Sequence, residues 1–201
     1  MKKKNRTWII VVLVLAIVVF GIIKWGISTF NGFVTLEEGV TGQWANVENV
    51  YQRRGDLIPN LVATVKGYAE HEQETLTQVV EARAKATSVT IDPTNITPES
   101  LAAFQQAQDG LSSALSRLLV TIERYPDLKA NQNFLDLQGQ LSEIEEQIQF
   151  SRRYYNGTAR DMNILVQSFP SNLIARSFGF NEADYFEIEL PTERETPKVE
   201  F

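Results

Sequence analysis

The sequence predicts an all-α protein in which one N-terminal transmembrane helix is followed by an antiparallel four-helix bundle with long helices. Three observations lead to this fold class. An uncharged apolar run lies close to the N-terminus, and apolar residues then recur every three or four positions over most of the remaining chain. Alternation with a period of two, the pattern of a strand, is limited to the short sequence FEIEL at residues 186–190.

The apolar run begins at Trp8 and carries no charge as far as residue 23. Because Lys24 can extend its amine toward water, the segment continues through Trp25 to residue 27. At about 1.5 Å per residue it spans roughly 30 Å, the hydrocarbon thickness of a bilayer. A cleaved signal peptide is the alternative, but no small-residue cleavage site follows. We therefore predict an uncleaved transmembrane helix at residues 8–27, held in the lipid bilayer.

Basic residues flank the apolar run unevenly. Four of them lie in a basic N-terminal tail at residues 1–7, and only Lys24 closes the run. Because basic residues favour the cytoplasmic side, we expect a single-pass cell-membrane protein with a cytoplasmic N-terminus and an extracytoplasmic bundle. Of 19 Lys and Arg, five lie in residues 1–27, whereas all 25 Asp and Glu lie beyond them. The remainder carries 14 minus 25, or −11, charges, so we expect no nucleic acid partner.

Four amphipathic helices are predicted at residues 33–54, 56–88, 98–125 and 131–168. In the third, Gln108 is the one polar residue in an apolar heptad seam. The signals for a helix start are a capping box of Thr35 with Glu38, Asp56 as an N-cap, and Thr97-Pro98. The signals for a helix end are Asn31-Gly32, Gly55 in a left-handed conformation, Pro126 and Pro170. Short connections give an antiparallel bundle domain at residues 33–180. Residues 181–201, with seven acids and two bases, are predicted to form an acidic mobile tail.

The segment QRRGDLIPNLV at residues 52–62 allows two interpretations. As a helix-to-helix turn, it would place two arginines at the negative end of one helix dipole and proline in the first turn of the next. As a recognition surface at the end of the bundle away from the membrane, beside PDLKAN at residues 126–131, it would bind a partner protein. The candidate partner-binding residues are Arg53, Arg54, Asp56, Pro59 and Asn60.

The segment FPSNLIARSFGF at residues 169–180 is a second candidate site. Ser171 is expected to cap a short helix, and the bundle's connectivity places this segment beside the bilayer. Its apolar side chains either pack under the bundle or enter the membrane interface. The candidate interface residues are Leu173, Ile174, Phe178 and Phe180.

No pattern in the sequence predicts a catalytic, cofactor or metal site. His71 is the single histidine, and Glu74 is its one acidic neighbour at helical spacing, so a solvated histidine is favoured over a metal ligand. The motifs GxSxG, GxGxxG and GxxxxGK[ST] are absent, and there is no cysteine to serve as a nucleophile or a zinc ligand. We therefore expect a protein that is not an enzyme.

Four stretches in combination resemble the LemA family: QRRGDLIPNLVATVKGYAEHE, YPDLKANQNFLDLQ, RRYYN, and FPSNLIARSFGF with YFE. They span most of residues 30–188. The resemblance implies a single-pass bacterial membrane protein with an antiparallel helical bundle and no established catalytic site. It also implies an envelope protein partner such as a membrane metallopeptidase, because members are often associated with such enzymes. A relative takes part in forming a bacterial organelle membrane.

Two functions from different classes follow. The first is a non-enzymatic interaction scaffold or adaptor, anchored in the bacterial envelope, that positions another protein. The second is a lipid-facing membrane-remodelling or envelope stress-response protein, which would act as a homo-oligomer through residues 170–180.

Overall fold

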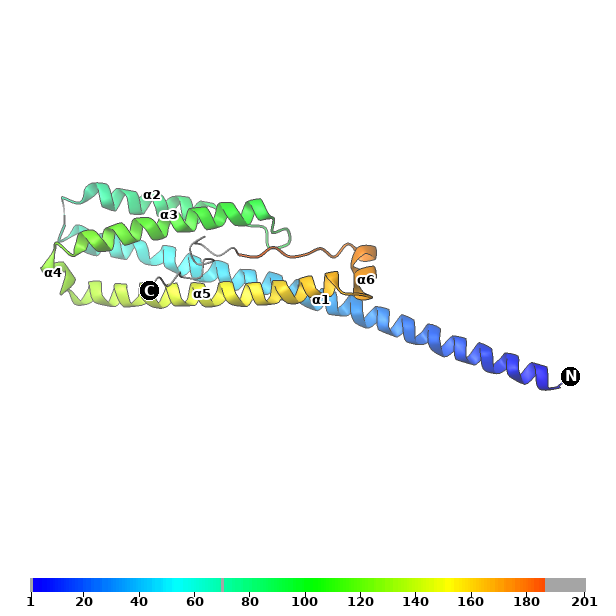
Figure 1. Cartoon of the computed structure of the whole chain (residues 1–201). Coiled ribbons are helices and arrows are strands. Elements are labelled where there is room, and N and C mark those ends of the chain that lie inside the picture. Colours follow the sequence, from blue (N-terminus) through cyan, green and yellow to red (C-terminus); the bar gives the residue numbers. More distant parts are fainter. Residues whose placement is uncertain (1, 70, 187–201) are drawn as a thin grey trace, which may run out of the picture. The chain divides into compact units, whose positions relative to one another are not determined.

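A computed structural model describes residues 2–69 and 71–186, and its regular elements there are all helices (Figure 1). The elements are α1 (Lys2–Lys66), α2 (Gln73–Ser88), α3 (Pro98–Ile122), α4 (Pro126–Lys129), α5 (Gln132–Gln167) and α6 (Ser171–Phe178). The predicted all-α class is confirmed. The described chain forms two compact units. The first unit holds residues 2–40 and 158–183, and the second unit holds residues 41–69, 71–157 and 184–186.

Helix α1 continues without a break through both places where the sequence predicted an end. Thr35 does not cap a new helix, since its hydroxyl donates to the Asn31 carbonyl at 2.9 Å within α1. Gly55 is helical, and Gly179 is the one residue with positive φ in the described chain. Helix α1 does not end at Gly55 because its apolar stripe keeps the same helical period across Tyr51, Ile58 and Leu61. Burying that stripe outweighs the local preference of glycine and proline to end a helix.

The connection from α1 to α2 therefore lies between Lys66 and Gln73 and not at 55–59. It meets the connection between α3 and α5, where the Asn131 amide donates to the Tyr68 hydroxyl at 2.9 Å and Arg124 pairs with Glu72 at 3.0 Å. The predicted placement of residues 55–59 beside 126–131 is wrong. His71 lies in this turn with its side chain exposed.

The second unit is a bundle of four helical segments, contributed by α1, α2, α3 and α5, around one apolar core. The predicted start of α3 is confirmed: the Thr97 hydroxyl accepts from the Ser100 N–H at 3.2 Å, and Pro98 occupies the first turn. Pro126 begins the short helix α4 after α3 has ended at Ile122. The principal buried residues are Ile58, Leu61, Val65, Leu76, Val79, Leu111, Leu115, Leu118, Ile122, Leu128, Phe134 and Leu141.

The first unit contains the N-terminal part of α1, the end of α5, and α6. From Trp8 onward α1 has an 18-residue window with a mean hydropathy of 2.8, none of it buried, so it is long and apolar enough to cross a membrane. Ser171 does not cap α6; its hydroxyl donates to the carbonyl oxygens of Leu165 and Ser168 at 2.7 and 2.9 Å. Gly179, with φ of 81°, ends α6.

The predicted mobile tail is wrong for its first residues, because side chains on α5 hold residues 183 and 186. In the first unit the Asn163 side chain accepts from the Ala183 N–H at 2.7 Å and donates to its carbonyl at 2.9 Å. In the second unit Asn156 makes the same pair of bonds with Phe186, at 2.9 and 3.1 Å. Residues 187–201, and with them most of FEIEL, lie outside the described residues.

The Phe186 ring fills an aromatic pocket in the second unit, and only 4% of the residue is exposed. It stacks on Trp44 with ring centroids 5.8 Å apart and meets Tyr155 edge-on at 5.3 Å. The Arg152 guanidinium lies over its face at 4.9 Å. The acidic composition predicted a mobile tail at this position. The buried ring of Phe186 instead supplies apolar area that helps to hold residues 184–186.

Tyr155 makes this pocket sensitive to alkaline pH. Burial, and secondarily the Asp184 carboxylate, raise the pKa of Tyr155 from 10.0 to about 12. The folded state therefore keeps a proton that the unfolded state loses, so stability is full below pH 10 and falls as pH rises toward 12. We expect Tyr155→Phe to lose less stability than wild type between pH 10 and 12 in urea unfolding. Equal losses would contradict this, and Tyr154→Phe, which removes an exposed phenol, is the control.

Candidate functional site

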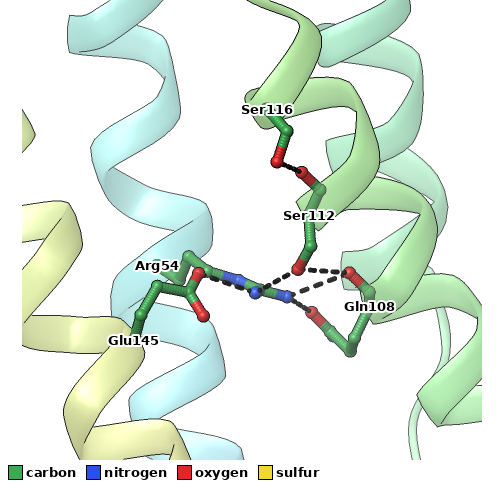
Figure 2. Close-up of polar contacts among 5 residues, drawn as sticks. All are labelled: Arg54, Gln108, Ser112, Ser116 and Glu145. Atoms are coloured by element: carbon green, nitrogen blue, oxygen red, sulfur yellow. Dashed lines mark hydrogen bonds and ion pairs between the residues drawn. The ribbon is translucent and has the colours of Figure 1, made fainter. Parts of the chain in front are cut away.

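Arg54 stands at the centre of a buried polar layer in the second unit, with only 1% of the residue exposed. Figure 2 shows its guanidinium reaching from α1 to both α3 and α5. Nη1 donates to Ser112 Oγ and to Glu145 Oε1, each at 2.9 Å. Nη2 donates to Gln108 at 2.6 Å through the side-chain oxygen and at 3.2 Å through the carbonyl. The Gln108 amide in turn donates to the Ala86 carbonyl on α2 at 3.2 Å, so one network joins four helices.

This layer explains the polar interruption of the third helix's seam. A buried guanidinium loses its hydration, and that cost is offset only when partners surround it. Gln108 supplies two acceptors to Arg54, and Glu145 supplies the opposite charge from the rim of the bundle. The layer fixes which turns of α1, α3 and α5 face one another, since a shift by one turn would leave the charge unpaired. The structure contradicts the prediction that Arg54 is available to bind a partner.

Arg53 points to a different face of α1, because adjacent helical residues differ by about 100°. Its side chain is exposed and donates to Gln147 Oε1 on α5 at 2.8 Å. Asp56, Pro59 and Asn60 are exposed as well. The structure thus divides the candidate residues of segment 52–62 into Arg54, which is internal, and four that remain on the surface.

Gly55 and Pro59 form a second structural device in the same segment. Proline has no N–H, so Pro59 leaves the carbonyl of Gly55, four residues earlier, without its helical donor. Arg83 on α2 replaces that donor, with Nε 2.6 Å from the Gly55 oxygen. A Cβ on Gly55 would lie 3.2 Å from the Thr87 methyl, so glycine permits this close approach of α2. Asp56 lies 4.0 Å from the same guanidinium.

Arg83→Met should lower the free energy of unfolding by about 1–2 kcal/mol, because it leaves the buried Gly55 carbonyl unpaired. In a Pro59→Ala background the loss should be about 1 kcal/mol smaller, since an alanine there restores the helical donor. Urea unfolding of the wild type, Arg83→Met, Pro59→Ala and the double variant measures this coupling. Equal losses in both backgrounds would mean that Arg83 does not replace the missing N–H, and Asp56→Asn separates the ion pair from this effect.

A cleft of about 340 Å³ lies beside these residues in the second unit. The side chains that line it include Glu48, Tyr51, Asp56, Arg83, Phe104 and Gln108. They supply both signs of charge and two aromatic walls. Across the described residues there is no group of three His, Asp or Glu side chains able to hold a metal ion.

Two exposed aromatic residues on α5 were missed by the sequence analysis. Phe150 and Tyr154 are each 55% exposed, and their ring centroids are 4.6 Å apart. They share a face of α5 with Gln147, the partner of Arg53. We call this set, Arg53, Gln147, Phe150 and Tyr154, the α1–α5 surface. Their exposure could have been predicted from the sequence, because both aromatic residues fall outside the apolar stripe of Ile144, Ile148, Ser151 and Tyr155.

The candidate interface residues on segment 169–180 are partly packed and partly exposed in the first unit. Phe178 meets Phe30 of α1 edge-on at 4.9 Å, and Phe180 stacks on the buried Phe33 at 4.7 Å. Leu173 and Phe178 nevertheless remain exposed, and Ile174 and Phe180 are half-buried. Packing therefore accounts for the ring of Phe180 and for one side of Phe178, and it leaves Leu173 and the rest of Phe178 uncovered.

These features define a class: an all-helical protein with a bundle held by a buried arginine layer and one N-terminal helix able to cross a membrane. The chain belongs to the LemA family, whose model matches residues 43–201. It is 28% identical over 196 residues to magnetosome protein MamQ 2 of Paramagnetospirillum magneticum, covering 89% of this chain and 71% of that protein. It is 26% identical over 141 residues to protein LemA of Metamycoplasma hominis, covering 70% and 61%. The resemblance in the sequence is confirmed.

Proposed function

We propose that this protein is a non-enzymatic interaction scaffold, anchored by residues 8–27 of α1 in a bacterial cell membrane, that positions another envelope protein through the α1–α5 surface. The observation that carries the proposal is the exposed pair Phe150 and Tyr154. Aromatic side chains supply much of the binding energy at protein interfaces. Arg53 adds a charged donor at the edge of the same surface.

The polar residues of segment 52–62 support a scaffold more than a reaction centre. Arg54 is engaged with protein acceptors in the folded state, and Arg83 from α2 occupies the Gly55 carbonyl of the segment. The partner expected at the α1–α5 surface is a protein segment with an apolar side chain to cover the two rings and a carboxylate or carbonyl for Arg53. The family resemblance suggests a membrane metallopeptidase as one such partner. A second copy of the chain is the alternative occupant.

The test is site-specific photocrosslinking in intact bacterial membranes. A benzoylphenylalanine at Phe150 should crosslink to another envelope protein. The same group at Val120, an exposed apolar residue on α3, is the matched control and should not give that product. Crosslinks from Phe150 to lipid or to the chain itself alone would contradict the scaffold function.

The proposed orientation, with the N-terminus in the cytoplasm, has its own test. Since the chain has no cysteine, single cysteines can report their side of the membrane. Suitable positions are Ser88, at the end of α2, and Asn95, in the loop before α3. Ser100 is unsuitable because it completes the cap of α3. Labelling of intact cells by a membrane-impermeant maleimide is expected. Labelling only after lysis would mean that the bundle lies in the cytoplasm, opposite to the proposed orientation.

A second candidate function, lipid-facing membrane remodelling by oligomers, is favoured by the apolar side chains exposed at Leu173 and Phe178. It requires the chain to self-associate in a bilayer. A chain that remains monomeric in vesicles would exclude it.

A further inference from the structure

We propose that α6 and Phe169, two residues before it, form an interfacial membrane element, in which Phe169, Leu173 and Phe178 lie among lipid headgroups beside the end of the α1 membrane span. The proposal rests on the membrane anchor of the proposed function and goes beyond the scaffold role. It assigns a lipid surface as the ligand of this part of the first unit.

Depth along α1 places Phe178 close to the lipid headgroups. The apolar span ends at Ile27, and Phe30 follows three residues later, about 4.5 Å farther along the helix. Phe178 packs on Phe30 with ring centroids 4.9 Å apart. The headgroup region is roughly 5–8 Å thick on each side of the hydrocarbon core. The ring of Phe178 therefore lies within the headgroup layer whenever residues 8–27 span the core.

Three large apolar side chains of this segment are exposed. Phe169, Leu173 and Phe178 are 80, 53 and 63% exposed in the first unit. Water would be an unfavourable environment for three large apolar side chains on so short a segment. Leu173 lies on the side of α6 opposite the buried Ser171 and Ala175, whereas Phe178 follows these two residues at helical spacing and is packed on one side by Phe30. Phe169, Leu173 and the outer side of the Phe178 ring thus remain exposed among the described residues.

The charge of α6 and its attachment to the neighbouring helices also fit a position at the lipid surface. Arg176 is the only ionisable residue of α6, and it is exposed. A single cation beside apolar side chains suits lipid phosphates, because its charge remains in the headgroup layer while the rings enter below it. Phe180 stacks on Phe33 at 4.7 Å and the Ser171 hydroxyl bonds to the Leu165 carbonyl, so α6 is fixed to α1 and α5 at this level.

The experiment is fluorescence quenching by spin-labelled lipid, with the full chain reconstituted in vesicles of phosphatidylcholine and phosphatidylglycerol. A single cysteine at Leu173 carries an environment-sensitive fluorophore, and a second variant at Phe169 guards against a local effect of the label. Cysteine at Glu37, exposed on α1 about 15 Å beyond Ile27, is the matched control. Cysteine at Ile17 reports the anchor itself.

Shallow quenchers, placed at the headgroup or upper acyl chain, should quench the labels at Leu173 and Phe169 at least about twofold more than the label at Glu37. Quenching at Ile17 by deep quenchers, with Leu173 and Phe169 no more quenched than Glu37, would overturn the interfacial element and leave the anchor standing. No quenching at Ile17 would overturn the anchor, and the interfacial element with it.

Discussion

Arg54→Ala is expected to lower the free energy of unfolding by about 3 kcal/mol, the low end of the range for breaking a buried charge pair. The variant removes four hydrogen bonds at once and leaves Gln108 without its donor inside the bundle. Two features keep the loss from being larger. Glu145 can turn to water from its half-exposed position, and Arg54 Nε has no partner within the described chain.

Arg53→Ala is the matched control, because it removes a neighbouring arginine of the same segment that lies on the surface. Its single bond to Gln147 is exposed, so the loss should stay within about 0.5 kcal/mol. Urea unfolding of the full chain in nanodiscs, followed by circular dichroism, compares the two. Similar losses from both variants would mean that the buried layer does not organise the bundle.

A companion variant separates lost packing from an uncompensated polar group. In Arg54→Leu alone, Gln108 remains buried without its cation, whereas Arg54→Leu with Gln108→Leu makes this level of the bundle apolar. Replacing all members of a buried polar network by apolar residues can restore stability that is lost when only one member is removed. We expect the double variant to be more stable than Arg54→Leu, with less definite packing of α3 against α1.

The sequence predicted the helices well where apolar spacing decides the structure. The heptad seams of α3 and α5 give their positions to within a few residues, because each seam can be buried only against other helices. Thr97-Pro98 was also informative, since its capping bonds are local. The span at residues 8–27 was predicted from length and near absence of charge, and the described helix there is long and apolar enough to cross a membrane.

Prediction failed where local and tertiary preferences conflict. Gly55 and Pro59 favour a turn in isolation, yet the stripe of α1 continues across them, and Arg83 from another helix supplies the missing donor. The role of Arg54 could not be predicted either, because its partners lie 54 to 91 positions away in sequence. Only Gln108, out of place in its seam, indicated that a polar layer existed.

Arg53 and Arg54 are adjacent in sequence, but one lies on the surface and the other is buried. A pair of adjacent arginines suggests one shared role, but a helix sends neighbouring side chains to different faces. Loss of partner binding after replacement of Arg54 would therefore report a disturbed bundle. Variants on the α1–α5 surface, such as Phe150→Ser, are the ones that test recognition.

Phe186→Ala should lower the free energy of unfolding by about 3 kcal/mol, as for other buried phenylalanines. The ring contacts Trp44 and Tyr155 in the second unit, and its loss would open a cavity between them. With Trp8 and Trp25 replaced by phenylalanine, Trp44 becomes the single tryptophan. Its emission should then move to longer wavelength, and acrylamide should quench it more strongly.

Tyr185→Ala is the control, since that neighbouring side chain is exposed. If both variants left stability and Trp44 emission unchanged, residues 184–186 would not be part of the folded unit. The expected asymmetry follows from geometry: the Asn156 side chain fixes the backbone of residue 186, so the side chain there enters the pocket and the preceding one faces outward. The buried ring thus acts together with the Asn156 bonds to hold residues 184–186, and removing the ring should weaken that attachment.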